Sequence, residues 1–170
     1  ELKSSVRYVV KSKARNRRDI DMIYLIGSVK ETRLVKPYIE VNISPFAKSI
    51  PIFSNSRSHS IKTDNSSNTD LQGLTFTEMP WLLESKSQNK ELAQLSKRLW
   101  PNRSDSLSRI FALGFDSYNV ITPLMLMKQA PYIRHYGQTG VLQLNDNGVL
   151  TRSLLWGQYT RGKVTEVDIN

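Results

Sequence analysis

The spacing of apolar residues near the start of the chain predicts a strand followed by a helix. Residues 21–26 form an almost continuous apolar run, which is too short for a typical helix and is typical of a strand buried on both faces, as in parallel sheets. Ser28 and Glu31 form a capping box, in which each side chain binds the backbone N–H of the other residue. A helix is therefore expected from Val29.

The pattern continues with a second and a third strand. Residues 51–54 form a short apolar run that suits a parallel neighbour of the first strand, and Pro37 is expected to kink or shorten the helix between them. Residues 54–70 are rich in Ser and Asn, with a single strong apolar residue, so a long surface loop is expected there. Residues 74–79 alternate apolar and polar, which predicts a strand that Pro80 ends.

Two helices and two hairpins are expected in the second half. Leu residues at helical spacing predict a helix over 91–99, and Ser104 or Asp105 is expected to cap the next one. The apolar face of that next helix is expected to hold Leu107, Phe111, Gly114, Tyr118 and Ile121. Asn147-Gly148 lies between two apolar runs, which is a strong hairpin signal, and a second turn is expected at residues 161–163.

Composition and charge narrow the chemistry. The chain has no Cys, which excludes disulfides, thiolate zinc sites and Cys nucleophiles, and its two His residues, His59 and His135, lie far apart in sequence. The net charge of +9 is local, because residues 1–18 hold seven of the 24 basic residues and a single acid. A cluster over 11–18 could meet phosphate or an anionic membrane, but no aromatic residue interleaves it, and a solvated segment is the favoured interpretation. No nucleic-acid partner is predicted.

The best candidate for a ligand site follows the predicted parallel strands. Ser54, Asn55, Ser56 and Arg57 come directly after the second strand, and Ser28 follows the first. Open α/β sheets bind ligands beyond the carboxyl ends of their strands, and Arg57 suits bidentate carboxylate recognition. These five residues are the ligand-cleft candidates, and a merely solvated loop is an equally good interpretation of the same residues.

Catalytic signatures are absent from the sequence. It contains no G-x-G-x-x-G, G-x-x-x-x-G-K-[ST], G-x-S-x-G or H-E-x-x-H motif. Asp19 and Asp21 share a strand face but are more simply explained as compensating the charge of Arg17 and Arg18. We therefore predict no catalytic residue, no metal ligand, no cofactor and no enzyme activity.

Seven segments, in order and with compatible spacing, resemble the carboxyl-terminal domain of the LppC/LpoA family of outer-membrane lipoproteins. The resemblance covers about residues 17–165. The segments are Asp19-Ile-Asp-Met-Ile-Tyr-Leu, Arg33-Leu-Val-Lys-Pro, Ile52-Phe-Ser-Asn-Ser-Arg-Ser, Leu71-Gln-Gly-Leu-Thr-Phe-Thr-Glu-Met-Pro, Arg109-Ile-Phe-Ala-Leu-Gly-Phe-Asp-Ser-Tyr, Gly137-Gln-Thr-Gly-Val-Leu and Arg152-Ser-Leu-Leu-Trp-Gly-Gln-Tyr-Thr-Arg-Gly-Lys-Val.

The resemblance implies part of a type I periplasmic-binding-protein fold, which has two α/β lobes with parallel sheets flanked by helices, here ending in β-hairpins. By the wiring of that fold, about 1–52 and 139–170 would belong to the second lobe and about 53–138 to the first, with crossovers near Ser54 and residues 137–140. The family's amino-terminal helical repeat domain, its lipidated Cys and the earlier strands of both lobes have no counterpart in this chain. The missing strands are expected to pack against Ile23, Leu25 and Phe53.

The implied function is a non-enzymatic one in peptidoglycan synthesis. The resemblance implies a periplasmic regulator that stimulates a class A penicillin-binding protein by direct binding. Its partners would be that synthase and the remaining part of the same lipoprotein, which a lipid anchor outside this chain attaches to the outer membrane. The alternative is a solute-binding module for a small amino-acid-like or carboxylate ligand, because solute receptors share the fold. Arg57 favours the alternative, and the lack of an aromatic stack near it opposes the alternative.

Overall fold

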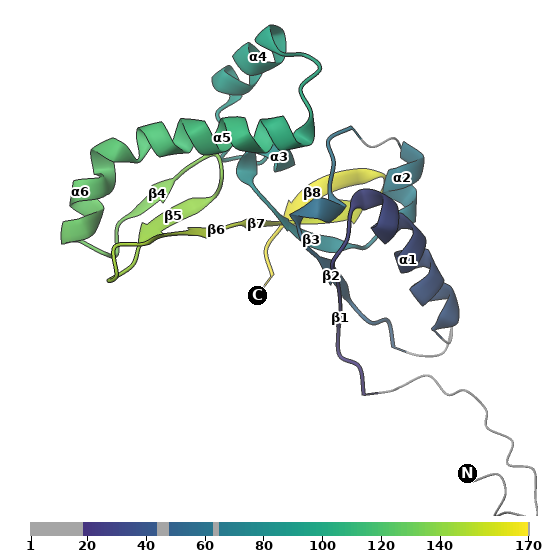
Figure 1. Ribbon diagram of the computed structural model, residues 1–170. Coiled ribbons are helices and arrows are strands. Elements are labelled where there is room, and N and C mark those ends of the chain that lie inside the picture. Colours follow the sequence, from purple (N-terminus) through teal and green to yellow (C-terminus); the bar gives the residue numbers. More distant parts are fainter. Residues whose placement is uncertain (1–18, 44–47, 63–64, 170) are drawn as a thin grey trace, which may run out of the picture.

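The computed structural model describes residues 19–43, 48–62 and 65–169, and its elements form two groups that lie side by side (Figure 1). The predicted basic cluster at 11–18 lies outside the described residues. The first group consists of β1 (Ile23–Leu25), α1 (Val29–Asn42), β2 (Ile52–Ser54), the short 3-10 helix η2 (Ser56–Ser58), α2 (Asn65–Asp70), β3 (Thr75–Glu78), β7 (Leu155–Thr160) and β8 (Lys163–Val167). The remaining elements are α3 (Pro80–Leu83), α4 (Lys90–Leu99), α5 (Asp105–Asn119), α6 (Ile121–Gln129), β4 (Arg134–Tyr136), β5 (Val141–Leu144) and β6 (Leu150–Ser153).

The predicted β-α-β unit at the start of the chain is confirmed. β1 and β2 are parallel, with Tyr24 opposite Phe53, and α1 begins at Val29. The capping box is present, since the Ser28 hydroxyl accepts a hydrogen bond from the Glu31 amide while the Glu31 carboxylate accepts one from the Ser28 amide at 2.7 Å. Pro37 does not end the helix, which continues to Asn42.

The sheet of the first group is mixed. Among the described strands the order is β1-β2-β3-β7-β8. β1, β2 and β3 are parallel to one another, β7 is antiparallel to β3, and β8 is antiparallel to β7. β3 is the strand predicted over 74–79, and Pro80 begins α3 directly after it. Figure 1 shows α1 and α2 together on one side of this sheet.

The prediction of a long surface loop over residues 54–70 is in part wrong. Within that range the chain forms η2 and α2, and the side chains of Ser58 and His59 are buried. The Ser and Asn content that indicated a loop instead supports local caps. Asn55 caps η2, because its side-chain oxygen accepts a hydrogen bond from the Arg57 amide at 3.2 Å.

Both predicted hairpins are confirmed. β5 and β6 pair around the Asn147-Gly148 turn, where Gly148 has a φ of 73°, a value that favours glycine. β7 and β8 pair around Arg161 and Gly162, which both have positive φ. β4 joins β5 and β6 in a separate three-stranded sheet within the described residues.

The division of the strands between the two sheets differs from the predicted lobe boundaries. The predicted crossover near Ser54 would separate β2 from β3, yet Phe53 and Ser54 of β2 pair with Thr75 and Phe76 of β3 in one sheet. The predicted return at residues 137–140 would put 141–153 with β7, but these residues form β5 and β6 of the other sheet. The chain instead leaves the first sheet after β3 and returns to it at Leu155.

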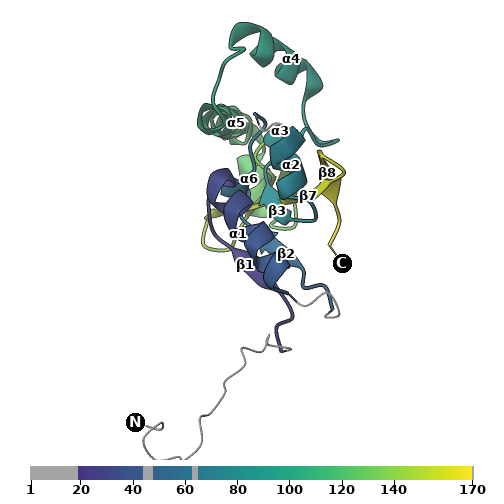
Figure 2. The same ribbon diagram turned by 90° about the vertical axis from the view of Figure 1, so that its right-hand side faces the viewer.

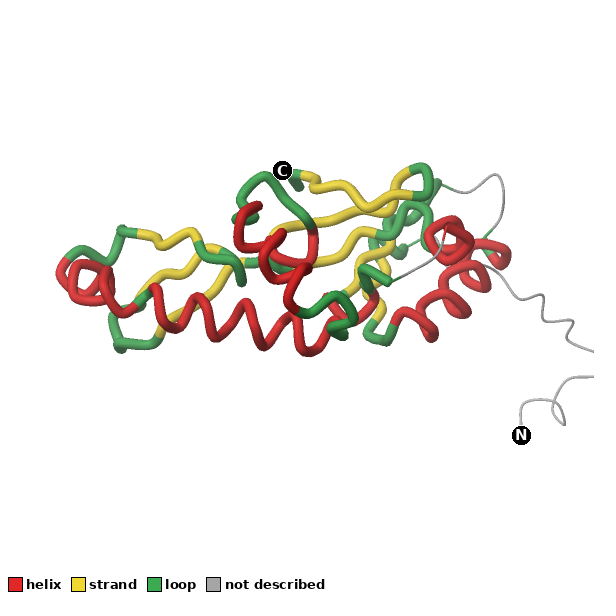
Figure 3. Tube along the Cα trace, turned by 90° about the horizontal axis from the view of Figure 1, so that it is seen from above, coloured by secondary structure: helices red, strands yellow, loops and turns green. Residues whose placement is uncertain are grey.

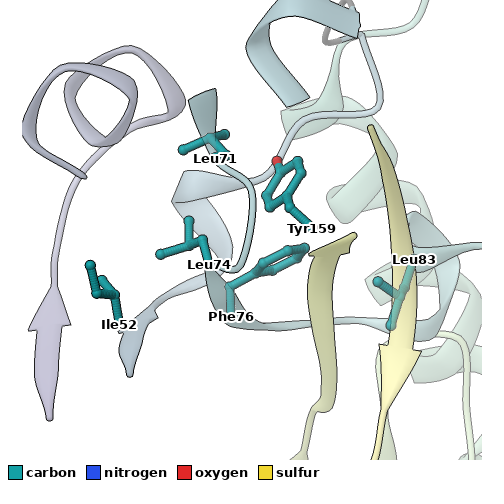
Figure 4. Packing of buried hydrophobic residues seen from close by; sticks show 6 residues of the cluster. All are labelled: Ile52, Leu71, Leu74, Phe76, Leu83 and Tyr159. Carbon is teal, nitrogen blue, oxygen red and sulfur yellow. The ribbon is translucent and has the colours of Figure 1, made fainter. Parts of the chain in front are cut away.

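The main core is formed by side chains of the five-stranded sheet and of the segments packed against it. Leu74, Phe76 and Tyr159 lie side by side there (Figure 4), and the Phe76 and Tyr159 rings are 5.2 Å apart between centroids. The full set of buried residues in this cluster is Ile52, Leu71, Leu74, Phe76, Leu83 and Tyr159. Each fully buried side chain of this size contributes about 1.5–3 kcal/mol through removal of apolar surface from water. Two smaller clusters lie around Trp81 and around Met127.

The prediction for the buried face of α5 is wrong. The buried positions are Ser108, Ala112 and Asp116, whereas four of the five predicted positions, Leu107, Gly114, Tyr118 and Ile121, are exposed and Phe111 is half-buried. The strongly apolar side of this helix therefore faces outward. Figures 1 and 3 show α5 as a long rod along the edge of the molecule, and Figure 2, in which α5 is seen nearly end-on, shows α4 outside it.

Candidate functional site

The candidate site is a cavity of about 590 Å³ where three elements meet. Its walls come from the amino-terminal turns of α1 and α5 and from the segment that contains η2. η2 follows β2 directly, so the cavity lies at the carboxyl ends of the parallel strands, as the sequence predicts for a ligand site.

Two of the five predicted cleft residues line this cavity, Ser28 and Arg57. The side chains of Ser54 and Asn55 are engaged in the fold: the buried Ser54 hydroxyl donates to the Leu25 carbonyl at 2.8 Å, and Asn55 caps η2. Ser56 contributes through its backbone, because its carbonyl accepts a hydrogen bond from Arg109 at 2.9 Å.

The structure adds four cationic residues that the sequence interpretation missed. Lys30 and Arg33 come from α1, Lys62 from the segment after η2, and Arg109 from α5. Lys30 and Arg33 are three positions apart on one helix, so their side chains are neighbours on its surface. This pair could have been recognised from the sequence. Arg109 lies more than 50 positions after Arg57, and only the folded chain brings the two together.

A buried carboxylate holds the site in place. Glu78 has a fully buried side chain, and its Oε2 accepts a hydrogen bond from Arg109 Nη2 at 2.6 Å and lies 3.1 Å from His59 Nδ1. Its other oxygen accepts a bond from the Met79 amide at 3.0 Å. Because Arg109 also binds the Ser56 carbonyl, this network ties α5, β3 and the η2 segment together.

His59 has a structural role in this network. Its ring stacks on Phe76, with centroids 4.9 Å apart, and the hydroxyl of Tyr159 donates to the neighbouring Ser58 carbonyl at 3.3 Å. The sequence alone does not show this role of His59, because its partners lie 17 and more positions later in the chain.

Two pKa shifts accompany the site. Burial, followed by the charges of Glu78 and Asp105, raises the pKa of the Tyr159 hydroxyl well above its ordinary value. The hydrogen bond from the Ser28 amide, and then the one from its hydroxyl, lowers the pKa of Glu31. The shifts favour a neutral Tyr159 hydroxyl, which donates a hydrogen bond, and an ionised Glu31 carboxylate, which accepts them.

Stability is therefore expected to fall above about pH 10, where a tyrosine ionises in an unfolded chain but Tyr159 stays neutral in the folded one. The contribution of Tyr159 is complete below that pH and is lost as the pH rises further. Urea unfolding between pH 8 and pH 11 measures this loss. Tyr159→Phe should weaken the loss, whereas Tyr118→Phe, at an exposed position, should leave it unchanged. Equal alkaline sensitivity of both variants would contradict the assignment.

Across the described part of the chain, no group of three His, Asp or Glu residues is placed to hold a metal ion. Over the same residues, no single helix is both long and apolar enough to cross a bilayer; α5 and α6 reach that composition only as a pair, bent by 62° at their junction.

Known structures share this arrangement of elements. The LpoA (YraM) C-domain of Haemophilus influenzae, described as a regulator of PBP1A, superposes with a TM-score of 0.73 and 24% identity, over 90% of this chain and 46% of that one. A "putative branched-chain amino acid ABC transporter" of Chromobacterium violaceum superposes with a TM-score of 0.59 and 23% identity, over 81% of this chain and 42% of that one. The chain thus has a periplasmic-binding-protein-like fold, with a mainly parallel sheet and antiparallel strands at its end.

Sequence comparison then identifies the family. The model described as "LppC putative lipoprotein" matches residues 1–162, so the chain belongs to the LppC family. The penicillin-binding protein activator LpoA of Vibrio vulnificus is 35% identical over 159 residues, which is 94% of this chain and 25% of that protein. The chain spans about a quarter of the length of the curated relatives that it matches. The resemblance stated from the seven segments is confirmed.

Proposed function

We propose that this chain binds a penicillin-binding protein and raises its activity without chemistry of its own. The observation that carries the proposal is the family match over residues 1–162, together with 35% identity to a protein named as a penicillin-binding protein activator. Exposed aromatic side chains, among them Tyr38, Tyr132 and Tyr136, supply contacts that a protein partner can use.

The finer proposals follow the family resemblance. The partner is a class A synthase of peptidoglycan, the contact is direct, and the chain acts in the periplasm as part of a lipoprotein anchored to the outer membrane. The remaining part of the same lipoprotein is a second partner. The small-ligand alternative is compatible with this role, because a protein partner uses the outer surface while a ligand would use the cavity.

Binding and stimulation of a purified class A synthase test the proposal. Surface-immobilised chain should bind the synthase saturably and increase the rate at which it polymerises glycan. Alanine substitution should locate the contact, because a few aromatic residues carry most of the binding energy at protein interfaces, about 2 kcal/mol or more each. The exposed aromatic residues to replace are Tyr38, Tyr118, Tyr132 and Tyr136. Absence of binding, or an equal small effect at every position, would count against direct docking by this chain.

A further inference from the structure

The cavity beside Arg57 has a cationic wall. Five of the residues that line it are cations, Lys30, Arg33, Arg57, Lys62 and Arg109. Val29 is the one aliphatic side chain among the lining residues. The charged ends of these side chains suit an anionic ligand.

The cations are only in part neutralised by the protein. Arg33 is paired with Asp70 at 2.8 Å and Arg109 with Glu78 at 2.6 Å. Arg57 lies near enough to Glu31 to lower the pKa of its carboxyl, but the two form no ion pair.

Lys30 and Lys62 complete the set. Within the described residues they have no carboxylate within ion-pair distance, and Lys62 donates a hydrogen bond to the Asn102 carbonyl at 3.4 Å. Lys30, Arg57 and Lys62 are thus three exposed cations on one cavity wall that can bind an anion.

Backbone amides add to the positive electrostatic potential of the cavity. The first residues of α1 and α5, which are 14 and 15 residues long, line the cavity at Val29, Lys30, Asp105 and Ser106. The first N–H groups of a helix have no partner inside the helix, and the helix dipole makes this end positive. Two such ends meet at this cavity together with the three cations.

Two polar atoms of the cavity residues are buried without a partner. They are Asp105 Oδ1, which can accept a hydrogen bond, and Arg109 Nε, which can donate one. Both residues line the cavity, and buried polar groups in folded proteins are almost always bonded to protein, water or ligand. A group that both donates and accepts would satisfy the two atoms at once.

We propose that this cavity binds a small oxyanion, carboxylate or phosphate, that also carries a hydrogen-bond donor. Lys30, Arg57 and Lys62 bind the anionic oxygens, together with the first amides of α1 and α5. Asp105 accepts from the donor of the ligand, and Arg109 Nε donates to one of its oxygens. This site is separate from the surface proposed for the synthase.

Titration calorimetry of the full 170-residue chain tests the proposal, with glutamate, inorganic phosphate and leucine as probes at low salt. Glutamate or phosphate should bind saturably and leucine at least tenfold more weakly. Arg57→Gln and Lys62→Gln should each weaken the binding at least tenfold, whereas Lys128→Gln, which removes the same charge from α6 at the far end of α5, should change it less than twofold. Circular dichroism of each variant confirms that it is folded.

Asp105→Asn distinguishes the two sources of the oxyanion. It should weaken glutamate, whose ammonium group donates to the carboxylate, and should leave phosphate equal or tighter. Three results would overturn the proposal: no saturable binding of either anion, preference for leucine, or equal effects of Arg57→Gln and Lys128→Gln. Synthase stimulation is measured on the same variants, so that loss of the anion site and loss of the proposed function are seen separately.

Discussion

Replacing Glu78 by alanine should lower the free energy of unfolding by about 3–5 kcal/mol, because it leaves the buried His59 ring and the partly buried Arg109 guanidinium without their carboxylate. Arg109, His59 and the Met79 amide all lose a bond. Urea unfolding followed by circular dichroism at pH 7 measures the change. A loss of this size is a large part of the stability of an ordinary domain.

The control for Glu78→Ala is Glu166→Ala, an equal truncation at an exposed position of β8, which should change stability by less than about 0.5 kcal/mol. The double variant Glu78→Ala with Arg109→Ala should cost less than the sum of the two single changes, because the two side chains share one interaction. Additive losses, or a loss below about 1 kcal/mol for Glu78→Ala, would show that the network does not hold the site.

The second large effect is expected at the apolar surfaces that the described chain leaves uncovered. A groove of about 500 Å³ lies between α4 and α5 and is lined by Leu99, Trp100, Leu107, Ile110 and Phe111, among others. Ile110 is 63% exposed, although natural domains rarely leave a contiguous face of this kind in water. On the first sheet, β1 lies at an edge, and both Tyr24 within it and Ile26 directly after it are exposed.

We expect the other half of the family's carboxyl-terminal domain to cover these surfaces. The LpoA C-domain of Haemophilus influenzae has more than twice as much chain as it shares with this one. Alone, the chain should therefore self-associate; with that half supplied as a second polypeptide, it should form a 1:1 complex. Size-exclusion chromatography with light scattering measures both states.

Ile110→Lys should weaken this complex at least tenfold, since burying such a side chain contributes about 1.5–3 kcal/mol. Gln94→Lys adds the same charge at an exposed position of α4 and should have little effect. A chain that is monomeric and folded by itself, and that binds no second half, would refute this expectation.

Features that depend on neighbouring residues could be predicted from the sequence. Ser28 and Glu31 are three positions apart, and their capping box fixes where α1 begins. Asn147-Gly148 sets the hairpin of β5 and β6 in the same way. In both cases the atoms that interact belong to residues within one turn, so the pattern of residue types is enough.

Features that depend on distant partners could not be predicted. Glu78 reads as an ordinary polar residue of an alternating strand, and only the folded chain shows Arg109 and His59 beside it. α5 was assigned the wrong buried face because its apolar side faces outward in the described structure, and amphipathicity alone does not say which side is covered. The division of the strands between the two sheets differs from the predicted lobe boundaries for a similar reason, since strand order cannot be read from strand spacing.

The candidate site was predicted only in part because its residues come from distant parts of the sequence. Arg57 was found because it follows a strand directly, whereas Lys30, Lys62 and Arg109 come from three other places in the chain. Ser54 was chosen by the same rule as Arg57 but points into the fold, where it binds the Leu25 carbonyl. Successive residues of a strand face opposite sides, so position after a strand indicates the region of a site without selecting its side chains.

The position of Tyr159 has a consequence for the order of events during synthesis. The first sheet needs β7 beside β3, with Thr75 paired to Gln158, and its core needs Tyr159 next to Phe76. A ribosome releases these late residues only after most of the chain has emerged, so the amino-terminal strands must wait with an open edge and an incomplete core. Contacts so distant in sequence also slow folding, and a nascent chain in this state is exposed to aggregation. The hairpin of β7 and β8 is thus the segment whose arrival completes the five-stranded sheet.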